Sequence, residues 1–283
     1  MQLKQTLASA ITRLSADHTP SPLMNAELLL MFILNCDRAY LYAHPERELT
    51  ADETAHYQAA LAQRARGVPA QYITGHQEFW GLDLIVTPAV LIPRPETEHV
   101  IETVLGLLTS ESGSQTAVRI ADVGTGSGCI ALALARELPH AEIYATDISP
   151  AAVEIARANA ARHQLEDRIQ FHETDLVCGL AGNSFDLIVS NPPYVGDSEA
   201  DQVQREVRKF EPRNAVFAGP TGSEVIARLI PQAKAALKPG GWLVVEISSA
   251  IADHVKNLLR GWHDVRITPD LQSIPRVVRA RKP

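Results

Sequence analysis

The feature that most restricts the fold of this chain is a regular alternation of short apolar runs and helical patterns after residue 118. Each run has the length of a buried strand and is bounded by turn formers, whereas the intervening segments carry apolar residues at helical spacing. We expect strands at 118–123, 142–146, 169–172, 185–190 and 241–247, and helices at 130–138, 150–163, 223–237 and 251–259. The alternation indicates a mainly parallel α/β sheet with helices on both faces, and a final antiparallel pair is expected at 265–268 and 277–280.

The first 75 residues have a different pattern, which predicts a small helical bundle. Apolar residues such as Leu3, Leu7 and Leu14 recur at helical spacing. Ser21 followed by Pro22 resembles a helix N-cap with proline in the first turn. Thr50, with a glutamate three residues later, forms a capping-box pattern. Most helical bundles of this kind are only structural, and the functional alternative is that this one grips a macromolecular partner.

Between the two patterns, apolar residues alternate with polar ones, which indicates a β-hairpin. We therefore divide the chain into a helical domain at 1–75, a hairpin linker at 76–94 and an α/β domain at 95–283. Pro95 is suited to open a helix. The proline-ordered loop 92–98 is therefore either a helix-entry turn with solvated charges or one wall of a site. The Ser/Gly/Thr-rich residues 109–116 are expected to form a surface loop.

Composition excludes several classes of protein. The 283 residues suggest about two domains, and 46% apolar with 21% charged residues is an ordinary globular mixture. No apolar run reaches the roughly 20 residues of a membrane span, and the first residues lack the apolar core of a signal peptide, so we expect a cytoplasmic protein. The three cysteines are widely spaced, which indicates neither a disulfide nor a metal site. A net charge of -7 argues against a nucleic-acid partner.

The sequence Asn191-Pro192-Pro193-Tyr194 follows the apolar run 185–190, so it lies at the carboxyl end of a predicted strand, where open α/β sheets bind ligands. The two prolines fix φ and remove two backbone donors. The Asn191 side-chain oxygen and the Pro192 carbonyl are therefore suited to accept both hydrogens of a planar NH2 group. Tyr194 offers a flat face for the rest of the substrate. The plainer interpretation is a strand-ending turn.

A glycine-rich turn, Gly124-Thr125-Gly126-Ser127-Gly128, follows an earlier predicted strand and precedes a helix. Glycines at this place bring bare backbone amides close to a ligand. The turn departs from the dinucleotide pattern Gly-x-Gly-x-x-Gly, which needs glycine where Cys129 stands. The spacing therefore favours a cofactor without a pyrophosphate.

Acidic residues end the neighbouring strands. Asp147 is placed to accept both hydroxyls of a ribose; a helix cap is the alternative, but Ser149 suits that role better. Asp175, with Leu176 beside it, is placed to reach an adenine amine. Asp122 is expected to orient the glycine turn or to reach the amino-acid part of a cofactor.

The glycine turn 124–128, Asp147 and the sequence 191–194, in this order and spacing along the chain, resemble a class I S-adenosylmethionine-dependent methyltransferase that acts on a planar nitrogen. Three further stretches, together with the N-terminal helices and hairpin, are similar to the peptide-chain release factor glutamine methyltransferases, the HemK-like family. These stretches are Pro69-Ala70-Gln71-Tyr72-Ile73-Thr74-Gly75, Phe79-Trp80-Gly81 and Leu91-Ile92-Pro93-Arg94-Pro95-Glu96-Thr97-Glu98. The resemblance covers nearly the whole chain.

The resemblance implies a Rossmann-like domain with a seven-stranded sheet and N5-methylation of the glutamine in the Gly-Gly-Gln motif of class 1 release factors. It implies S-adenosyl-L-methionine bound by residues 124–128, Asp147, Asp175 and Leu176, with Asn191 beside it. Substrate contacts fall on 191–194, and the expected catalytic residues are Asn191, Pro192 and Tyr194. It implies no metal, and we expect a monomer that transfers methyl without a general base. Two positions depart from the family pattern, namely Ser248 in place of glycine and Leu176 in place of an aromatic residue.

Other functions fit the same residues less well. An N6-adenine methyltransferase of DNA or RNA uses the same clamp, namely the two acceptors of Asn191 and Pro192, on an exocyclic amine. The net charge and the family-specific hairpin region argue against this function. A binding module without activity would not need both the glycine turn and the clamp. An NAD-dependent oxidoreductase conflicts with Cys129.

Overall fold

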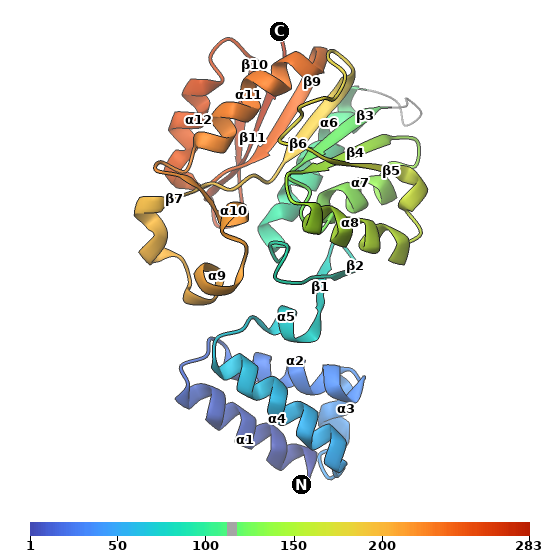
Figure 1. Cartoon of the computed structure of the whole chain (residues 1–283), viewed down its shortest axis with the longest axis vertical. Helices are drawn as coiled ribbons and strands as arrows, with labels where there is room; N and C mark the ends of the chain where they lie inside the picture. Colours follow the sequence, from blue (N-terminus) through green and yellow to red (C-terminus); the bar gives the residue numbers. More distant parts are fainter. Residues whose placement is uncertain (112–117) are drawn as a thin grey trace. The chain divides into compact units, whose positions relative to one another are not determined.

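The computed structural model describes residues 1–111 and 118–283, and the chain divides into two compact units (Figure 1). The first, the helical unit, comprises Met1–His76 and Gln204–Phe210. The second, the α/β unit, comprises Gln77–Val203 and Glu211–Pro283. Among the described residues, no helix is long and apolar enough to cross a membrane.

The helical unit has the bundle that the sequence predicts. Its helices are α1 (Leu3–Ala16), α2 (Pro22–Leu34), α3 (Arg38–Ala43), α4 (Ala51–Ala65), α5 (Ala70–Thr74) and, from later in the chain, α9 (Arg205–Phe210). Leu14, Leu29, Leu30 and Leu61 are buried in its core. Tyr57 is buried with them, and its hydroxyl satisfies its hydrogen-bonding need by donating to the Ala26 carbonyl at 3.0 Å.

The two predicted helix starts differ in outcome. Thr50 forms the capping box: its Oγ1 accepts from the Glu53 amide at 3.1 Å, and Glu53 Oε2 accepts from the Thr50 amide at 2.9 Å. Pro22 opens α2 as expected, but the predicted cap at Ser21 is wrong, because its side chain makes no capping hydrogen bond. Instead, Asn25 Nδ2 donates to the Ser21 carbonyl at 3.2 Å and stabilises this turn.

Helix α9 packs with the helical unit through a buried arginine. Arg64 is only 3% exposed and pairs with Glu206 of α9 at 2.7 Å. Its Nε donates to Asn25 Oδ1 at 2.6 Å and its NH1 to the Val68 carbonyl at 3.1 Å. These partners compensate the burial of the charge. No pattern in the sequence predicted an element in this segment.

The predicted hairpin is present but shorter than expected. Its strands are β1 (His76–Phe79) and β2 (Leu82–Ile85), joined by Trp80 and Gly81, whose φ angles of 51° and 69° are those of a tight hairpin turn. The second strand ends shortly before Pro88, which lacks an amide hydrogen. Asn159 Oδ1 accepts from the Ile85 amide at 2.7 Å, which connects this strand to helix α8 (Pro150–Arg162).

The seven-stranded sheet confirms the predicted fold class. Its strands are β3 (Arg119–Val123), β4 (Glu142–Asp147), β5 (Ile169–Glu173), β6 (Phe185–Ser190), β9 (Leu237–Glu246), β10 (His263–Pro269) and β11 (Pro275–Arg281). They are ordered β10-β11-β9-β6-β3-β4-β5. Neighbours from β9 to β5 run parallel, and β11 is antiparallel to both β9 and β10. Val123 lies opposite both Thr146 and Ser190, so the loops after these strands start side by side.

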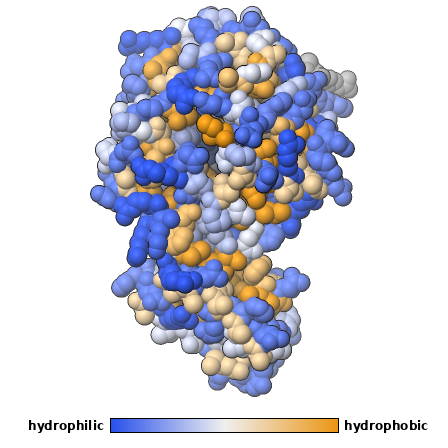
Figure 2. Space-filling view, viewed as in Figure 1, coloured by the Kyte–Doolittle hydropathy of each residue, from blue (hydrophilic) through white to orange (hydrophobic). Residues whose placement is uncertain are grey.

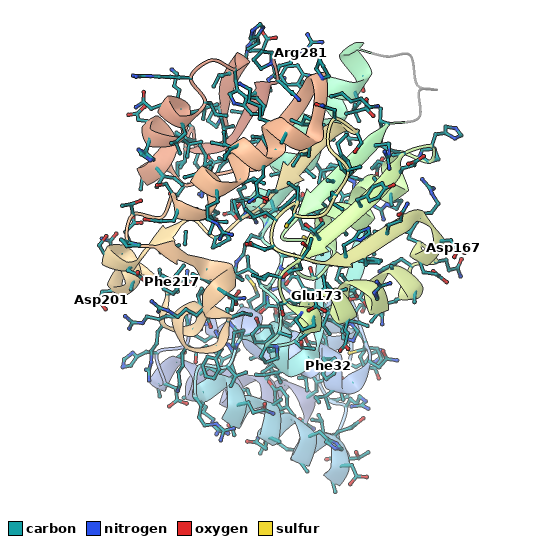
Figure 3. The ribbon with its side chains drawn as sticks, turned by 45° about the horizontal axis from the view of Figure 1, so that its top comes forward. Phe32, Asp167, Glu173, Asp201, Phe217 and Arg281 are labelled. Atoms are coloured by element: carbon teal, nitrogen blue, oxygen red, sulfur yellow. The ribbon has the colours of Figure 1, made fainter. Side chains whose placement is uncertain are left out.

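Helices cover both faces of the sheet (Figures 1 and 3). One core contains residues of α6 (Glu98–Glu111), α7 (Cys129–Glu137) and α8 (Pro150–Arg162). The opposite core contains residues of α11 (Glu224–Ala236) and α12 (Ala252–Leu258). Short 3-10 turns lie at Pro95–Thr97 (η1), Glu166–Arg168 (η2), Asp197–Gln202 (η3) and Ser249–Ile251 (η4). Mostly hydrophilic side chains cover the face of the α/β unit seen in Figure 2.

Helix α6 corrects the predicted loop at 109–116. The helix continues to Glu111, and the Thr109 hydroxyl donates to the Leu105 carbonyl at 2.7 Å within it. Threonine can therefore continue the helix here, because its side chain bonds back to the preceding turn. The rest of the predicted loop lies outside the described residues.

The connection from β6 to β9 contains short elements that the sequence did not predict. They are β7 (Val195–Gly196), η3, α9, α10 (Arg213–Val216) and β8 (Phe217–Gly219), and β7 pairs with β8 in parallel. Glu211 fixes the return of this connection to the α/β unit. Its buried carboxylate binds the Arg94 guanidinium and accepts from the Ile92 amide at 3.2 Å.

Candidate active site

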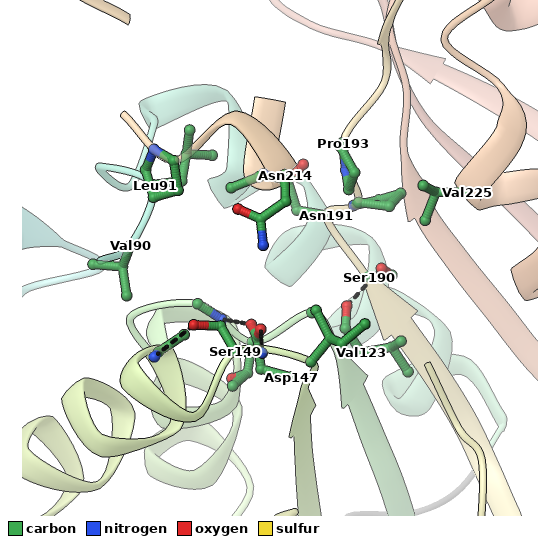
Figure 4. Close-up of a pocket in the computed structure, with 18 of the residues that line it drawn as sticks. Val90, Leu91, Val123, Asp147, Ser149, Ser190, Asn191, Pro193, Asn214 and Val225 are labelled. Carbon is green, nitrogen blue, oxygen red and sulfur yellow. Dashed lines mark hydrogen bonds between the residues drawn. The ribbon is translucent and has the colours of Figure 1, made fainter. Parts of the chain in front are cut away.

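A cavity of about 290 Å³ lies at the carboxyl ends of the parallel strands (Figure 4). Its lining comes from the loops after β3, β4, β5 and β6, from residues 89–97 and from the segment 212–217. Ligand sites of open α/β sheets occur at this edge. The structure therefore brings residues 124–127 of the predicted glycine turn, Asp147, Asp175 and Asn191 to one cavity. Gly128 does not line it and packs against Leu132 and Ala156 instead.

The glycine turn lies against this cavity, but its backbone amides have other partners. The amides of Gly124 and Thr125 both donate to the Thr146 carbonyl, at 2.8 and 2.9 Å, and the Gly126 amide donates to Asp147 Oδ2 at 2.9 Å. A Cβ added at Gly126 would meet no atom within 4 Å. The glycines thus leave room for a ligand to approach the backbone, as the sequence predicts, while the amides of these three residues already donate within the protein.

Asp122 supports the turn from behind. It does not line the cavity and is fully buried, with Oδ2 accepting from Thr125 Oγ1 at 2.6 Å and from the Ala131 amide at 3.1 Å. Burial raises the pKa of Asp122 to about 7, and the bonds from Thr125 and Ala131 oppose this rise. Of the two roles expected for Asp122, the structure places it in the first, orienting the turn.

Asp147 ends β4 and lines the cavity. Its Oδ1 accepts from the Ser149 amide at 2.9 Å, and its Oδ2 holds Gly126. Ser149, as expected, caps α8 by accepting from the Ala152 amide at 3.3 Å. Burial raises the pKa of Asp147, whereas these backbone hydrogen bonds lower it. Each carboxylate oxygen has two lone pairs, so Asp147 retains acceptors for ligand hydroxyls.

Asp175 and Leu176 line the same cavity beyond β5. The Asp175 carboxylate pairs with the Arg228 guanidinium, a partner that the sequence did not indicate. Leu176 has φ of 55° and its carbonyl accepts from Thr146 Oγ1 at 2.8 Å. An adenine amine bound by Asp175, as predicted, would therefore share the Asp175 carboxylate with Arg228.

Asn191 lies at the cavity with a defined side-chain orientation. Its Nδ2 donates to Thr97 Oγ1 at 3.0 Å, which leaves Oδ1 available as an acceptor. Pro192 and Pro193 line the cavity beside it. Ser190, the last residue of β6, donates from Oγ to the Val123 carbonyl at 2.6 Å and thereby anchors the start of the loop.

Tyr194 does not line the cavity. Its ring packs against the core on the α11 and α12 side, and its hydroxyl donates to Glu246 Oε1 at 3.0 Å. Burial raises the pKa values of both Tyr194 and Glu246. The flat substrate-facing surface predicted for Tyr194 is thus not at the cavity wall, and the side chain braces the loop.

No individual role at the site was predicted for Arg228, Thr97 or Asn214, although the loop 92–98, which contains Thr97, was one predicted wall of a site. Thr97 is 1% exposed and reaches Asn191 from the end of η1. Asn214 projects its amide into the cavity from α10 (Figure 4). The sequence around Asn214 carries no periodic pattern, and its position depends on Glu211 holding this segment against Arg94.

The fold and this cavity define a class of protein. The structure is similar to the hMettl16 catalytic domain in complex with MAT2A 3'UTR hairpin 6, with a TM-score of 0.56, 20% identity and coverage of 82% of each chain. It is also similar to the N-terminal domain of human METTL16 in complex with SAH, with a TM-score of 0.53, 17% identity and coverage of 94% and 92%. The chain has the class I methyltransferase fold.

Sequence relatives define the family more narrowly. The PrmC N-terminal domain model matches residues 5–75, and the methyltransferase small domain model matches residues 103–209. Release factor glutamine methyltransferase from Koribacter versatilis is 57% identical over 284 residues, covering 100% of this chain and 99% of the relative. The protein of that name from Moorella thermoacetica is 43% identical, covering 95% of each. This chain belongs to the release factor glutamine methyltransferase family.

Proposed function

We propose that this protein transfers a methyl group from S-adenosyl-L-methionine to the side-chain amide nitrogen of a release factor glutamine. The observation that carries the proposal is the position of Asn191, which lies on the cavity that also contains the glycine turn and Asp147. A nitrogen held by Asn191 would lie beside a ligand held by those groups. The N5 position and the Gly-Gly-Gln motif of class 1 release factors complete the proposed substrate.

The residues at the cavity fit the cofactor. The space beside the Gly126 Cα is open, so the cofactor can come close to the backbone there. Asp147 keeps lone pairs that can accept hydrogen bonds from the ribose hydroxyls. Ile148 is 60% exposed and Leu176 lines the same region, so both offer apolar surface to a base. When bound, the sulfonium cofactor supplies an electrophilic methyl group.

The chain itself contributes alignment. Asn191 Oδ1 and the Pro192 carbonyl would each accept one hydrogen of the glutamine NH2, and Pro193 and Tyr194 hold the loop rigid. The lone pair of an amide nitrogen is delocalised into the carbonyl group. Two hydrogen bonds that favour a pyramidal nitrogen make this lone pair available to the methyl group, and they strengthen toward the transition state. The remaining task is in-line placement at near-attack distance. The methylated nitrogen is acidic enough to lose its proton to water.

The experiment that tests this function is transfer of labelled methyl to a purified class 1 release factor, beside duplex DNA and ribosomal RNA as alternative acceptors. We expect label on the Gly-Gly-Gln glutamine and none on nucleic acid. Asn191→Ala should lower kcat by about 100-fold or more, as loss of an oriented polar group at a reacting centre does. Label on adenine alone would instead assign an N6-adenine methyltransferase.

The helical unit is proposed to recognise the release factor as a whole protein. Its family model matches separately from the methyltransferase model, and exposed apolar residues such as Met24 and Phe32 lie on α2. In this proposal, residues 1–75 bind the substrate protein, and residues 76–94 link this domain to the methyltransferase domain. Residues 95–283 form the methyltransferase domain, which catalyses methyl transfer. The enzyme would act as a monomer in the cytoplasm, without nucleic acid.

A further inference from the structure

Thr97 lies in the proline-rich stretch before α6, to which the proposed chemistry assigns no role. It ends the 3-10 turn η1, where its amide donates to the Arg94 carbonyl at 3.0 Å, so its backbone is fixed. It is 1% exposed and yet lines the cavity. A buried hydroxyl is normally hydrogen-bonded, and this one contacts Asn191 Nδ2 at 3.0 Å.

The hydrogen bond between Thr97 and Asn191 has a defined polarity. A hydroxyl has one hydrogen and two lone pairs. In this contact Asn191 Nδ2 is the donor, so Thr97 Oγ1 uses a lone pair toward Asn191. Glu246, the last residue of β9, is 1% exposed, and its Oε1 accepts from the Tyr194 hydroxyl at 3.0 Å, which fixes the other end of the same loop.

This polarity decides which end of the Asn191 amide faces the cavity. The NH2 end is drawn to the Thr97 lone pairs, so the oxygen end faces the ligand. A flipped Asn191 would direct its NH2 toward the NH2 of a glutamine, and two donors facing each other form no hydrogen bond. The clamp therefore depends on a group that never meets the substrate amide.

We propose that Thr97 is a positioning residue that holds the Asn191 side chain with Oδ1 toward the reacting nitrogen. This inference rests on the proposed function. It predicts that loss of the Thr97 hydroxyl impairs alignment of the nitrogen and leaves cofactor binding intact. Positioning errors of this kind lower kcat by about 10- to 100-fold.

The test compares Thr97→Val, which has the same shape without the hydroxyl, with Thr97→Ser, which keeps it. Steady-state methyl transfer to the full-length release factor gives kcat and KM, and calorimetry gives the Kd for S-adenosyl-L-methionine. We expect Thr97→Val to lower kcat by about 10-fold or more with Kd within about threefold, and Thr97→Ser to retain kcat within about threefold. Thermal midpoints control for folding.

Thr97→Ala is the second variant, because it also removes the hydroxyl and adds no bulk at this buried position. We expect kcat to fall by about 10-fold or more, with cofactor Kd within about threefold. If Thr97→Val does not fold, the kcat of this second variant alone tests the positioning role of Thr97.

The outcomes separate the two claims. No transfer by the wild-type protein contradicts the proposed function. Transfer by the wild type, with Thr97→Val or Thr97→Ala within about threefold of its kcat, overturns the positioning role only. Equal losses in Thr97→Val and Thr97→Ser also overturn it, because they indicate packing of the methyl group instead of the hydroxyl.

Discussion

Gly126 and Gly128, in the turn after β3, both have positive φ, but a side chain added at each would meet different surroundings. Gly126, at 56°, has open space where a Cβ would stand, whereas a Cβ at Gly128, at 84°, would lie 2.5 Å from Leu132 Cδ1 and 3.2 Å from Ala156 Cβ. Both substitutions to alanine would strain the backbone, but only the second also overpacks the core between α7 and α8.

We therefore expect Gly128→Ala to lower the free energy of unfolding by about 2–4 kcal/mol and Gly126→Ala by about 1–2 kcal/mol. Gly126→Ala should instead raise the Kd for S-adenosyl-L-methionine, because its Cβ would occupy the space of the ligand. Urea unfolding and calorimetric titration measure the two quantities. Equal destabilisation by both variants, with unchanged Kd, would contradict this division.

Asp122 makes stability depend on pH. The pKa of Asp122 is raised by burial to about 7, compared with about 4 in an unfolded chain. Between these values the folded protein keeps a proton that the unfolded chain has lost. The contribution of Asp122 to stability is therefore full below pH ~4 and is lost as pH rises through about 7.

Asp122→Asn should remove this loss, because its amide cannot titrate and its oxygen can still accept from Thr125 and Ala131. We expect the unfolding free energy of the variant minus that of the wild type to increase between pH 5 and pH 8 by more than about 1 kcal/mol. Urea unfolding at both pH values measures it, with exposed Asp17→Asn as the charge-matched control. A constant difference would mean that Asp122 does not titrate in this range.

At the scale of elements, the capping box of α4 gives a local prediction. Thr50→Ala removes the acceptor of the Glu53 amide and should lower the free energy of unfolding by about 1 kcal/mol. Thr12→Ala is the matched control, since Thr12 is an exposed threonine inside α1 whose hydroxyl bonds back to Ala8. The control should have no destabilising effect, because alanine is the better helix former. Thermal or urea unfolding compares the two.

The strands were predictable where an apolar run ends in turn-forming residues. The predicted strand 185–190 has the bounds of β6, and the antiparallel pair at the end of the chain corresponds to β10 and β11. The run that forms β6 is buried on both faces, so local sequence determines that strand. The segment 197–219 is polar and aperiodic, and its short elements depend on Glu206 with Arg64 and Glu211 with Arg94. Contacts so distant in sequence leave no local pattern.

The same distinction applies to the site. Asn191 and Asp147 follow predictable strands, so their meeting at one sheet edge could be inferred. Thr97 and Asn214 come from segments outside the strand ends, and only tertiary packing brings them to the cavity. Tyr194 shows the converse, because adjacency to Asn191 in sequence did not put its ring on the cavity wall.

At the scale of the whole molecule, the proposed division of labour gives a test by truncation. Deletion of residues 1–75 should lower kcat/KM for the intact release factor by at least about 10-fold more than for a short Gly-Gly-Gln peptide, because only the intact protein has surface for the helical unit to bind. Methylation of the peptide serves as the internal control for a folded site. Losses of equal size on both substrates would contradict recognition by the helical unit.

The return of Gln204–Phe210 to the helical unit makes that unit a discontinuous domain. The chain passes between the units at 76–77, at 203–204 and again at 210–211, so residues 1–76 are not a detachable module. A transplant of this region to another catalytic domain would carry Arg64 without Glu206 and leave a buried charge unpaired. An exchange of the helical unit between proteins therefore has to include the segment 204–210.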